Sequence, residues 1–237
     1  YDDADRAIWM TGINRNISEQ KQAAARIQAV EREKDFLLKE VHHRVKNNLQ
    51  MISSLLSLQT NYVSDRQTLE ILKSGEARIF SMALVHDLLY RSQSQNCVQI
   101  NLADYIETLV NNLSSTYDTA KLNCKRVTLK LATEPIWVSI DIAIPCGLII
   151  NELTTNAMKH AFKKRQFGQI CIAVQFEEPQ THNHVILKVS DDGIGLPLEL
   201  DWQNTKSLGL QIVYILTNQL KGNIELTKKD FGTEFIV

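Results

Sequence analysis

The sequence lacks any uninterrupted apolar run near the roughly 18–20 residues that a membrane-spanning helix requires. Its first residues, Tyr1-Asp2-Asp3, also lack the basic and then apolar form of a signal peptide. These absences predict a soluble, cytoplasmic chain. Because the chain begins with tyrosine and not with methionine, we expect further sequence upstream, with room for a sensor domain or a membrane segment.

The chain also has few cysteines and almost no net charge. The four cysteines are scattered without C-x-x-C spacing, which argues against a zinc site or a disulfide framework and favours a reducing compartment. The 26 basic and 27 acidic residues leave a net charge of -1. A nearly neutral chain has no general electrostatic attraction to nucleic acid, so we expect no nucleic-acid partner.

Proline and glycine are absent from residues 19–62, which predicts one helix of about 60 Å at 1.5 Å per residue. A helix of this length is not stable alone in water and needs a partner helix. A turn at 61–65 and a second amphipathic segment at 65–90 provide one. Since two helices bury only one seam, we expect a homodimer that completes a four-helix bundle.

The long helix carries apolar residues at the spacing of an amphipathic face, centred on Val41, Val45 and Ile52. At about 100° per residue, His42 falls on the flank of this face and His43 falls nearly opposite it. The sequence therefore predicts a buried apolar face and a solvent-facing His43. The positions three, four and seven residues beyond His43 are polar: Lys46, Asn47 and Gln50. Taken alone, such a histidine is ordinary solvated surface.

The composition changes after a polar break at 91–96. In the segments that follow, alternating apolar residues predict strands and three-to-four spacing predicts helices. We expect strands at 97–100, 126–132, 136–139, 169–176, 184–190, 223–227 and 234–237, and helices at 102–117, 142–162 and 208–220. Helices on one face of a mixed sheet make an α+β sandwich. The predicted domains are a helical one at 19–95 and a second one at 96–237.

A first polar cluster lies on the predicted helix at 142–162. Glu152, Asn156 and Lys159 are spaced by four and three, so a carboxylate, an amide and an ammonium share one helix face. Amide oxygens bind hard cations and ammonium groups pair with phosphates, a combination suited to a magnesium-bound nucleotide. An ordinary polar helix face gives the same pattern, so this cluster does not decide the function by itself.

A second cluster follows the predicted strand at 184–190. Gly193 and Gly195 let the backbone turn sharply and admit a flat ligand. Asp191, at the end of the strand, can accept a hydrogen bond from an exocyclic amine. Many D-x-G-x-G sequences are only turns, so this cluster is a weak signal when taken alone.

Two glycine positions come later in the chain. Gly209 stands with Leu210 at the start of the predicted helix 208–220, where unpaired backbone N–H groups favour phosphate. Gly232 and Thr233 lead into the last strand. The four clusters therefore follow one another in a fixed order along the chain.

This order resembles the N, G1, G2 and G3 boxes of the Bergerat-fold ATP-binding family, which includes histidine kinases, gyrase-type topoisomerases, heat-shock ATPases and mismatch-repair ATPases. The run His-His-Arg-Val-Lys-Asn-Asn-Leu-Gln at 42–50 and the segment Ala-Leu-Val-His-Asp-Leu-Leu-Tyr at 83–90 select among them. Both are similar to histidine kinases with an H-R-x-K-N phosphoacceptor box, the HisKA_2 and HWE-like kinases. The resemblance covers about residues 36–237.

The resemblance implies a role for each of these residues. His43, directly before the arginine, is the implied phosphoacceptor. The implied ATP-site residues are Asn156 as Mg²⁺ ligand, Asp191 as acceptor for the adenine amine, Gly193 and Gly195 in the nucleotide turn, Gly209 and Leu210 on the phosphate side, Thr233 near the base, and Lys159 and Glu152 facing the phosphates and the metal.

Two departures from the family pattern matter. The commonest histidine kinases carry an acid directly after the phosphoacceptor, and here that residue is Arg44. Glu40, one turn before His43, can hydrogen-bond the imidazole, or it is a plain exposed charge. The lid at 196–208 is short, with Trp202 as its one aromatic residue, and we expect it to be mobile.

The implied function is that of a sensor histidine kinase. ATP and Mg²⁺ bind the domain at 96–237, the γ-phosphoryl group passes to His43, and an aspartate of a response regulator accepts it next. Residues 1–18 resemble the end of a PAS sensor domain and its junction. The alternatives are a Bergerat-fold ATPase clamp, which expects a transducer domain after the ATP site, and a degenerate kinase scaffold, which expects missing boxes.

Overall fold

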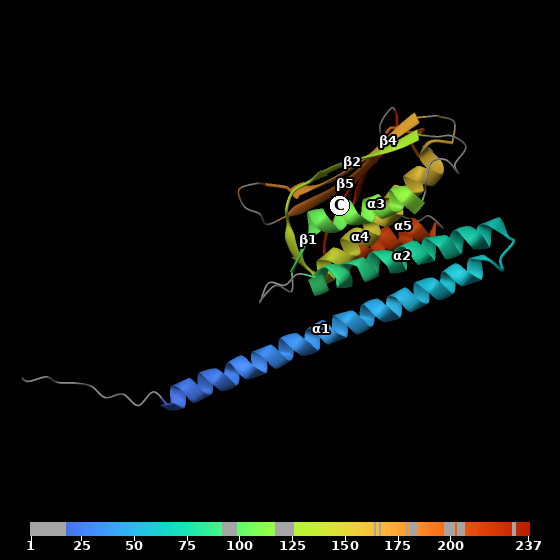
Figure 1. Cartoon of the computed structure of the whole chain (residues 1–237). Helices are drawn as coiled ribbons and strands as arrows, with labels where there is room; N and C mark the ends of the chain where they lie inside the picture. The colour runs from blue at the N-terminus through green and yellow to red at the C-terminus, as the bar shows by residue number, and fades with distance from the viewer. Residues whose placement is uncertain are drawn as a thin grey trace, which may run out of the picture. The chain divides into compact units, whose positions relative to one another are not determined.

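The structure is a computed structural model that describes residues 18–91, 99–116, 126–163, 165, 167–178, 180, 184–196, 202, 207–228 and 231–237 (Figure 1). The PAS-like segment predicted at 1–18 lies outside these residues apart from Ser18, and so does most of the predicted lid. The chain divides into two compact units, residues 1–41 and 42–237. None of the helices within the described ranges combines the length with the hydropathy that a bilayer-spanning segment needs.

The first unit contains the N-terminal part of α1 (Ser18–Thr60), whose ends agree with the predicted helix to within two residues. The absence of proline and glycine and the abundance of Ala, Gln, Lys and Glu favour this helix. Its apolar side chains are exposed, among them Val30 at 65%, Leu37 at 55% and Val41 at 53%. The expectation of a buried apolar face is therefore wrong for the single chain, because a lone helix has no surface against which to pack.

The second unit begins with the rest of α1 and with α2 (Arg66–Arg91), joined by a short turn. The carboxylate of Asp65 accepts a hydrogen bond from the backbone N–H of Thr68 at 2.7 Å and so caps the start of α2. The Thr68 hydroxyl and N–H together lower the pKa of Asp65. Beyond the turn, Gly75 of α2 faces Leu56 of α1. The predicted helical hairpin is confirmed.

The main sheet has five strands in the order β2-β4-β5-β7-β6. They are β2 (Arg126–Thr133), β4 (Phe167–Phe176), β5 (Val185–Asp191), β6 (Glu225–Lys228) and β7 (Thr233–Ile236). β2 and β4 are parallel, and the other neighbours are antiparallel. A smaller sheet pairs β1 (Gln99–Asn101) with β3 (Trp137–Ser139). Every predicted strand occurs, with ends shifted by no more than two residues.

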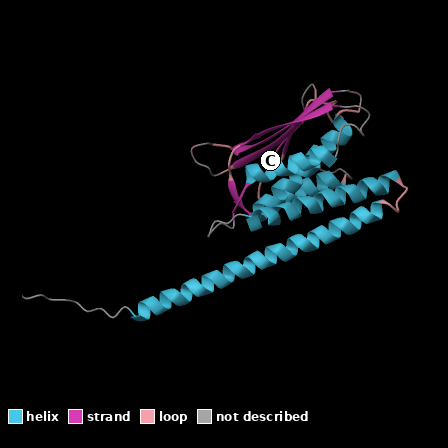
Figure 2. Cartoon of the chain, in the orientation of Figure 1, coloured by secondary structure: helices cyan, strands magenta, loops and turns pink. Residues whose placement is uncertain are grey.

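Three helices cover one face of the main sheet: α3 (Leu102–Thr116), α4 (Ile140–Asn156) and α5 (Leu208–Gln219) (Figures 1 and 2). On β4, Ile170, Ile172 and Val174 are fully buried, and the residues between them are more exposed. This alternation turns one face of the strand toward the helices. The predicted α+β sandwich is confirmed.

Helix α2 also takes part in the core of this unit. Val85 is fully buried and Leu89 is 7% exposed, and both belong to the same apolar cluster as residues of α3 and α4. The hydroxyl of Ser81 lies 2.8 Å from the hydroxyl of Tyr105 on α3. The helical hairpin and the sandwich are therefore joined through α2.

The predicted helix at 142–162 consists of two parts. α4 ends at Asn156 and continues as one π-helical turn, η1 (Ala157–Ala161). Such turns are rare and occur mostly as single turns inside α-helices, frequently at functional sites. The wider turn advances less around the helix axis with each residue, so it changes which side chains after Asn156 share a face.

Candidate functional site

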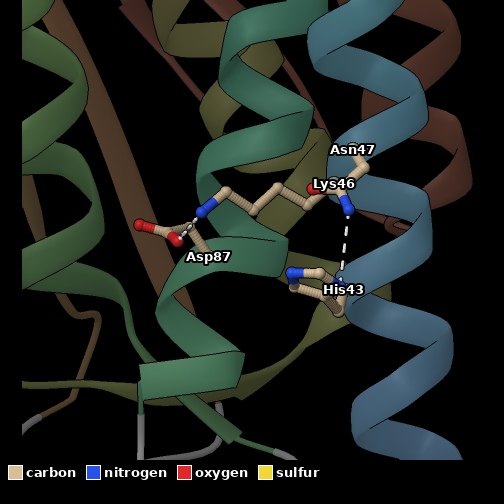
Figure 3. A network of polar contacts seen from close by, with 4 residues as sticks. All are labelled: His43, Lys46, Asn47 and Asp87. Atoms are coloured by element: carbon tan, nitrogen blue, oxygen red, sulfur yellow. Dashed lines mark hydrogen bonds and ion pairs between the residues drawn. The ribbon is translucent and has the colours of Figure 1, made fainter.

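The two adjacent histidines of α1 have different surroundings. His43 is exposed, and its Nδ1 lies 3.4 Å from the side-chain nitrogen of Asn47, one turn later on the same helix (Figure 3). His42 is half-buried, and its Nδ1 lies 3.1 Å from Nδ1 of His86 on α2. The predicted exposure of His43 is confirmed, whereas His42, which was expected on the flank of the apolar face, contacts α2.

An ion pair and a histidine pair tie α1 to α2 next to His43. Lys46 pairs with Asp87 of α2, and both side chains are mostly buried (Figure 3). The rings of His42 and His86 lie 5.3 Å apart between centroids and are tilted by 42°. Burial, and to a smaller degree His42, lowers the pKa of His86. A hydrogen bond between the two rings needs one N–H and one bare nitrogen, so the pair is held with at least one ring neutral.

The roles proposed for the other residues around His43 stay predictions. Glu40 is half-buried one helical turn before His43, and Arg44 is exposed. The position that carries an acid in the commonest histidine kinases is therefore a solvent-facing cation here.

A cavity of about 410 Å³ opens where α4, η1, the turn after β5, the start of α5 and β7 meet. It is lined by Leu153, Asn156, Ala157, His160, Ala161, Lys163, Val189, Asp191, Ile194, Gly195, Leu196, Ser207, Leu210, Thr233 and Phe235. Five of the predicted nucleotide-site residues are in this lining: Asn156, Asp191, Gly195, Leu210 and Thr233. Segments that are far apart in the sequence thus converge on one cavity.

Asp191 marks one end of the cavity. Its Oδ1 accepts a hydrogen bond from the N–H of Gly193 at 2.8 Å, and Thr233 lies directly across from it on β7. Burial raises the pKa of Asp191, with a smaller contribution from Asp192, while the bonds from Gly193 and Thr233 act against the rise. The carboxylate keeps lone pairs with which to accept a hydrogen bond from an amine of a flat ligand.

The glycines after Asp191 hold the turn against the π-helical turn. The N–H of Ile194 donates to the carbonyl of Ala161 at 2.9 Å. A Cβ on Gly193 would lie 2.4 Å from that same carbonyl oxygen, so only glycine fits there. Gly195 has a φ of 73°, in the left-handed region that favours glycine. Glycine is therefore required at 193 and favoured at 195, in the turn that borders the cavity.

The N-terminus of α5 marks the other end of the site. A Cβ on Gly209 would lie 2.7 Å from Oε2 of Glu152 and 3.5 Å from the side-chain nitrogen of Asn156. The structure thus brings together the predicted phosphate-side glycine and two residues of the predicted metal region. The N–H groups at this helix start favour an anion.

The donor set at this end suits a magnesium ion that is shared with phosphates. Asn156 offers an amide oxygen and Glu152 a carboxylate, and both are hard oxygen donors. Within the described ranges, no three His, Cys, Asp or Glu side chains gather into a group that would hold a metal. A bound Mg²⁺ would therefore take most of its oxygen ligands from phosphates and water, as this ion commonly does.

Glu152 already has a partner, which the sequence did not indicate. Arg78 of α2 makes two hydrogen bonds to its carboxylate, from Nε to Oε1 at 2.6 Å and from a terminal nitrogen to Oε2 at 3.0 Å. The Glu152 side chain is only 4% exposed. The two residues are 74 positions apart, so no local spacing pattern points to the pair.

His160 and Lys163 also line the cavity, whereas Lys159 is not among the lining residues. Burial is the main cause that lowers the pKa of His160, followed by the positive charges of Lys163 and Lys159. His160 follows Asn156 by four residues and Lys163 follows His160 by three, so helical spacing could have indicated that both side chains lie on the same side as Asn156. The role implied for Lys159 stays a prediction.

Trp202, the one aromatic residue of the predicted lid at 196–208, is among the residues that the structure describes. Its ring meets the ring of Phe235 edge-on, with 5.9 Å between centroids, and Phe235 lines the cavity. Edge-to-face contacts of this kind stabilise an aromatic pair beyond simple burial.

Two family models match the chain. One, described as histidine kinase (HisKA_2), matches residues 40–117. The other, described as histidine kinase-, DNA gyrase B- and HSP90-like ATPase, matches residues 141–237. The first model covers the helix segment with His43, and the second covers every residue that lines the cavity.

The chain is similar to curated sensor histidine kinases. It is 33% identical over 192 residues to the sensor histidine kinase PdtaS of Mycolicibacterium smegmatis, across 81% of this chain and 36% of that protein. It is 26% identical over 204 residues to blue-light-activated histidine kinase 2 of Erythrobacter litoralis, across 85% of this chain and 56% of that protein. The chain thus spans only about a third to a half of the length of these relatives.

A solved structure shares the fold. The histidine kinase domain of an Erythrobacter litoralis blue-light-activated histidine kinase aligns with a TM-score of 0.62 at 20% identity. The alignment covers 79% of this chain and 93% of that chain, so the same elements follow in the same order through most of both.

Proposed function

Because this chain belongs to the histidine kinases, with a HisKA_2 region followed by an ATPase domain of the histidine kinase type, we propose that it transfers the γ-phosphoryl group of ATP to His43. The observation that carries the proposal is that the chain contains two separate sites, one suited to accept a phosphoryl group and one suited to bind a nucleotide. An exposed histidine stands on α1, and a cavity lined both by the Asp191 carboxylate and by the N-terminus of α5 lies in the α+β sandwich.

ATP binds with its base at Asp191 and its phosphates toward the start of α5. The Asp191 carboxylate accepts a hydrogen bond from the adenine amine, and Thr233 lies beside it. Gly209 and the first N–H groups of α5 face the phosphates, with Asn156 nearby. Gly193 and Gly195 shape the wall against which the base lies.

The reaction is an in-line displacement at the γ-phosphorus. A bare ring nitrogen of His43 attacks, the new N–P bond forms as the P–O bond to ADP breaks, and the other ring nitrogen loses its proton. The transition state is loose, so the protein acts mainly by positioning and charge stabilisation. Glu40 is our candidate for accepting or orienting this proton, since Arg44 is a cation.

Magnesium is the expected companion of the nucleotide. When bound, it neutralises charge on the phosphates, and Asn156 and Glu152 are the residues of this chain that would hold it, while Lys159 would face the phosphates. Replacing Asn156 with Ala is expected to remove most of the gain in ATP affinity that Mg²⁺ brings. Titrations with Mg²⁺ and with a chelator measure this gain, and an undiminished gain would exclude the role of Asn156.

The whole protein then belongs to a two-component signalling system. The phosphoryl group passes from His43 to an aspartate of a response regulator, and a homodimer forms through the exposed apolar face of α1. A PAS-like sensor segment at 1–18, a helical dimerisation and phosphotransfer domain at 19–95 and a catalytic domain at 96–237 make up the chain. We place this activity in the cytoplasm.

Labelling with γ-labelled ATP tests the proposal. An acid-labile, base-stable phosphoprotein with the label on one histidine is the expected result. Multi-turnover release of phosphate without any phosphohistidine would instead identify an ATPase clamp. Nucleotide binding without either product would identify a degenerate scaffold.

A further inference from the structure

Helix α2 holds α4 by an ion pair at the phosphate side of the cavity. Arg78 and Glu152 share two parallel hydrogen bonds of 2.6 and 3.0 Å, and their side chains are 19% and 4% exposed. A two-bond pair fixes both the distance and the orientation of its partners. Because it is largely buried, salt screens it weakly.

The pair engages a carboxylate that the phosphate side of the site requires. Oε2 of Glu152 lies close to Gly209 and to the amide of Asn156. Both oxygens of the Glu152 carboxylate accept hydrogen bonds from Arg78. In this arrangement the carboxylate is therefore engaged with α2 and not with a ligand in the site.

One ion pair and one electrostatic influence indicate at which level of α2 the nucleotide site lies. Glu152 of α4 meets Arg78. Further along, His160 of η1 is influenced by the charge of Glu70, which acts to raise its pKa against the larger lowering effect of burial. α4 and η1 therefore run antiparallel to α2, and the cavity lies beside the segment between Glu70 and Arg78.

His43 stands at a different level of the hairpin. His42 contacts His86 and Lys46 pairs with Asp87, so the phosphoacceptor region lies beside residues 86 and 87 of α2. Arg78 precedes His86 by eight residues, which is about 12 Å along a helix. In-line attack requires the reacting atoms to approach within about 3–3.5 Å. This arrangement therefore keeps the phosphate side of the site away from His43.

The other contacts between α2 and the sandwich are less restrictive. Val85 and Leu89 are packed by apolar contact, which has no preferred direction. Ser81 and Tyr105 form hydrogen bonds between neutral groups, which are weaker than charge-assisted ones. Among the contacts described above, the charged pair is thus the strongest directional one between α2 and the sandwich.

We propose that the Arg78–Glu152 pair is an autoinhibitory latch. It fixes the ATP-binding region on α2 at a level where the γ-phosphoryl group cannot reach His43, and its release frees both the region and the Glu152 carboxylate for phosphoryl transfer. The inference rests on the proposed autokinase function.

The test is Arg78→Gln in the 237-residue chain. Without the guanidinium, the docked arrangement buries an unpaired carboxylate, so the released arrangement gains population. We expect the rate of His43 labelling at saturating ATP to rise at least about fivefold, the size of a typical coupling between two states. Amide hydrogen exchange in α2 between Ser81 and Leu89 is expected to become faster in the same variant.

The matched control is Arg66→Gln on the same helix. Arg66 pairs with Glu70 on the surface and its side chain is 92% exposed, so its loss is expected to leave both the labelling rate and the exchange unchanged. A labelling rate in Arg78→Gln that equals or falls below the wild-type rate would overturn the latch, because Arg78 would then support the active arrangement or have no part in it.

Two further measurements keep the test decisive. Arg78→Lys retains a charge but cannot make the two parallel bonds, so it is expected to give a smaller rise, and it carries the test if the glutamine variant does not fold. Wild-type labelling separates the two proposals. No phosphohistidine in any variant means that the proposed function fails, whereas phosphohistidine at an unchanged rate in Arg78→Gln means that only the latch fails.

Discussion

The ATP-binding sandwich and the long helix satisfy their apolar surfaces in different ways. Ile170 and Val174 on the sheet are fully buried within the single chain. Val41, Ile52 and Leu55 on α1 remain 53%, 43% and 54% exposed. A sheet covered by helices encloses its own core, whereas a hairpin of two helices has only one seam to bury.

This difference teaches which functional features are complete in one chain. A cavity lined by Asp191 and Asn156 is already formed in the single chain, and Gly209 lies near Asn156. The surface of α1 offers an apolar stripe that is suited to a second copy of the hairpin, as expected for a helical bundle. The following predictions separate the two regions, beginning with the largest effect.

Replacing His43 with Gln is expected to reduce histidine labelling to background while ATP affinity stays at the wild-type value. Glutamine has no nucleophilic ring nitrogen, and His43 lies outside the cavity lining. His42→Gln is the matched control and is expected to keep its labelling, although it loses the contact with His86. Labelling that survives in His43→Gln and disappears in His42→Gln would assign the phosphoacceptor to the other histidine.

Ile52→Asp is expected to weaken the dimer without affecting nucleotide binding. A symmetric interface buries the side chain twice at about 1.5–3 kcal/mol each, so the dissociation constant rises at least about 100-fold. Light scattering over a concentration series measures it. The control is Gln50→Asp, on the opposite face of the same helix, and a dimer equally weakened by both variants would contradict an interface on the apolar stripe.

Asp191→Asn is expected to weaken ATP binding by about 10–150-fold, because a hydrogen bond to a charged group contributes about 1.5–3 kcal/mol. Calorimetric titration measures this affinity. The neighbouring Asp192→Asn is the control, since the Asp192 side chain is exposed and accepts a hydrogen bond from the backbone N–H of Gln169. Equal losses in the two variants would rule out a specific role for Asp191.

The same carboxylate predicts a pH dependence. Burial raises the pKa of Asp191 above the ordinary 3.8, so the acceptor form is lost earlier on acidification than at an exposed aspartate. ATP affinity of the wild type is therefore expected to fall as the pH is lowered, while the affinity of Asp191→Asn stays flat. Parallel decreases in the two proteins would place the titrating group elsewhere.

The smallest effect is expected at the histidine pair. Burial, and then His42, lowers the pKa of His86 below 6.5, so the folded chain binds fewer protons than the unfolded chain in that range. The stability that this provides is present above pH 6.5 and is lost as the pH falls through the lower folded pKa. Thermal unfolding between about pH 8 and pH 5 measures it. Over this pH range we expect the melting temperature of the wild type to fall by about 2–4 °C more than that of His86→Gln.

The other charged groups beside this pair are Lys46 and Asp87, which neutralise each other. An identical acid response in wild type and His86→Gln would contradict a role of His86 in the stability of the hairpin at low pH.

Local periodicity explains which features could be predicted from the sequence. The solvent-facing side of His43 follows from the helix repeat, and the buried face of β4 follows from alternation. The order of the N-box helix and the glycine turns also indicated the ATP site, through its resemblance to the Bergerat-fold boxes, and the structure shows a backbone that requires glycine at 193 and favours it at 195. The helix repeat and the strand alternation depend on residues within one or two turns of chain, whereas the order of the boxes is a pattern along the whole second half of the sequence.

The features that could not be predicted depend on departures from regular geometry or on distant contacts. The π turn after Asn156 is one such departure, because the regular helical spacing that relates His160 and Lys163 to Asn156 does not predict a wider turn. The parallel pairing of β2 with β4 is likewise not encoded in the alternation of either strand, because the side-chain period is the same for both orientations.

The sequence by itself determined the elements and the outward direction of His43, since short-range sterics and hydrophobic periodicity set both, and its resemblance to the Bergerat-fold boxes indicated the residues gathered for ATP. Only the tertiary structure decided that Arg78 pairs with Glu152, 74 residues away along the chain. It also decided which part of α2 the cavity lies beside. An ion pair of this kind depends on where two separately formed helices meet, and that is a property of the packed core.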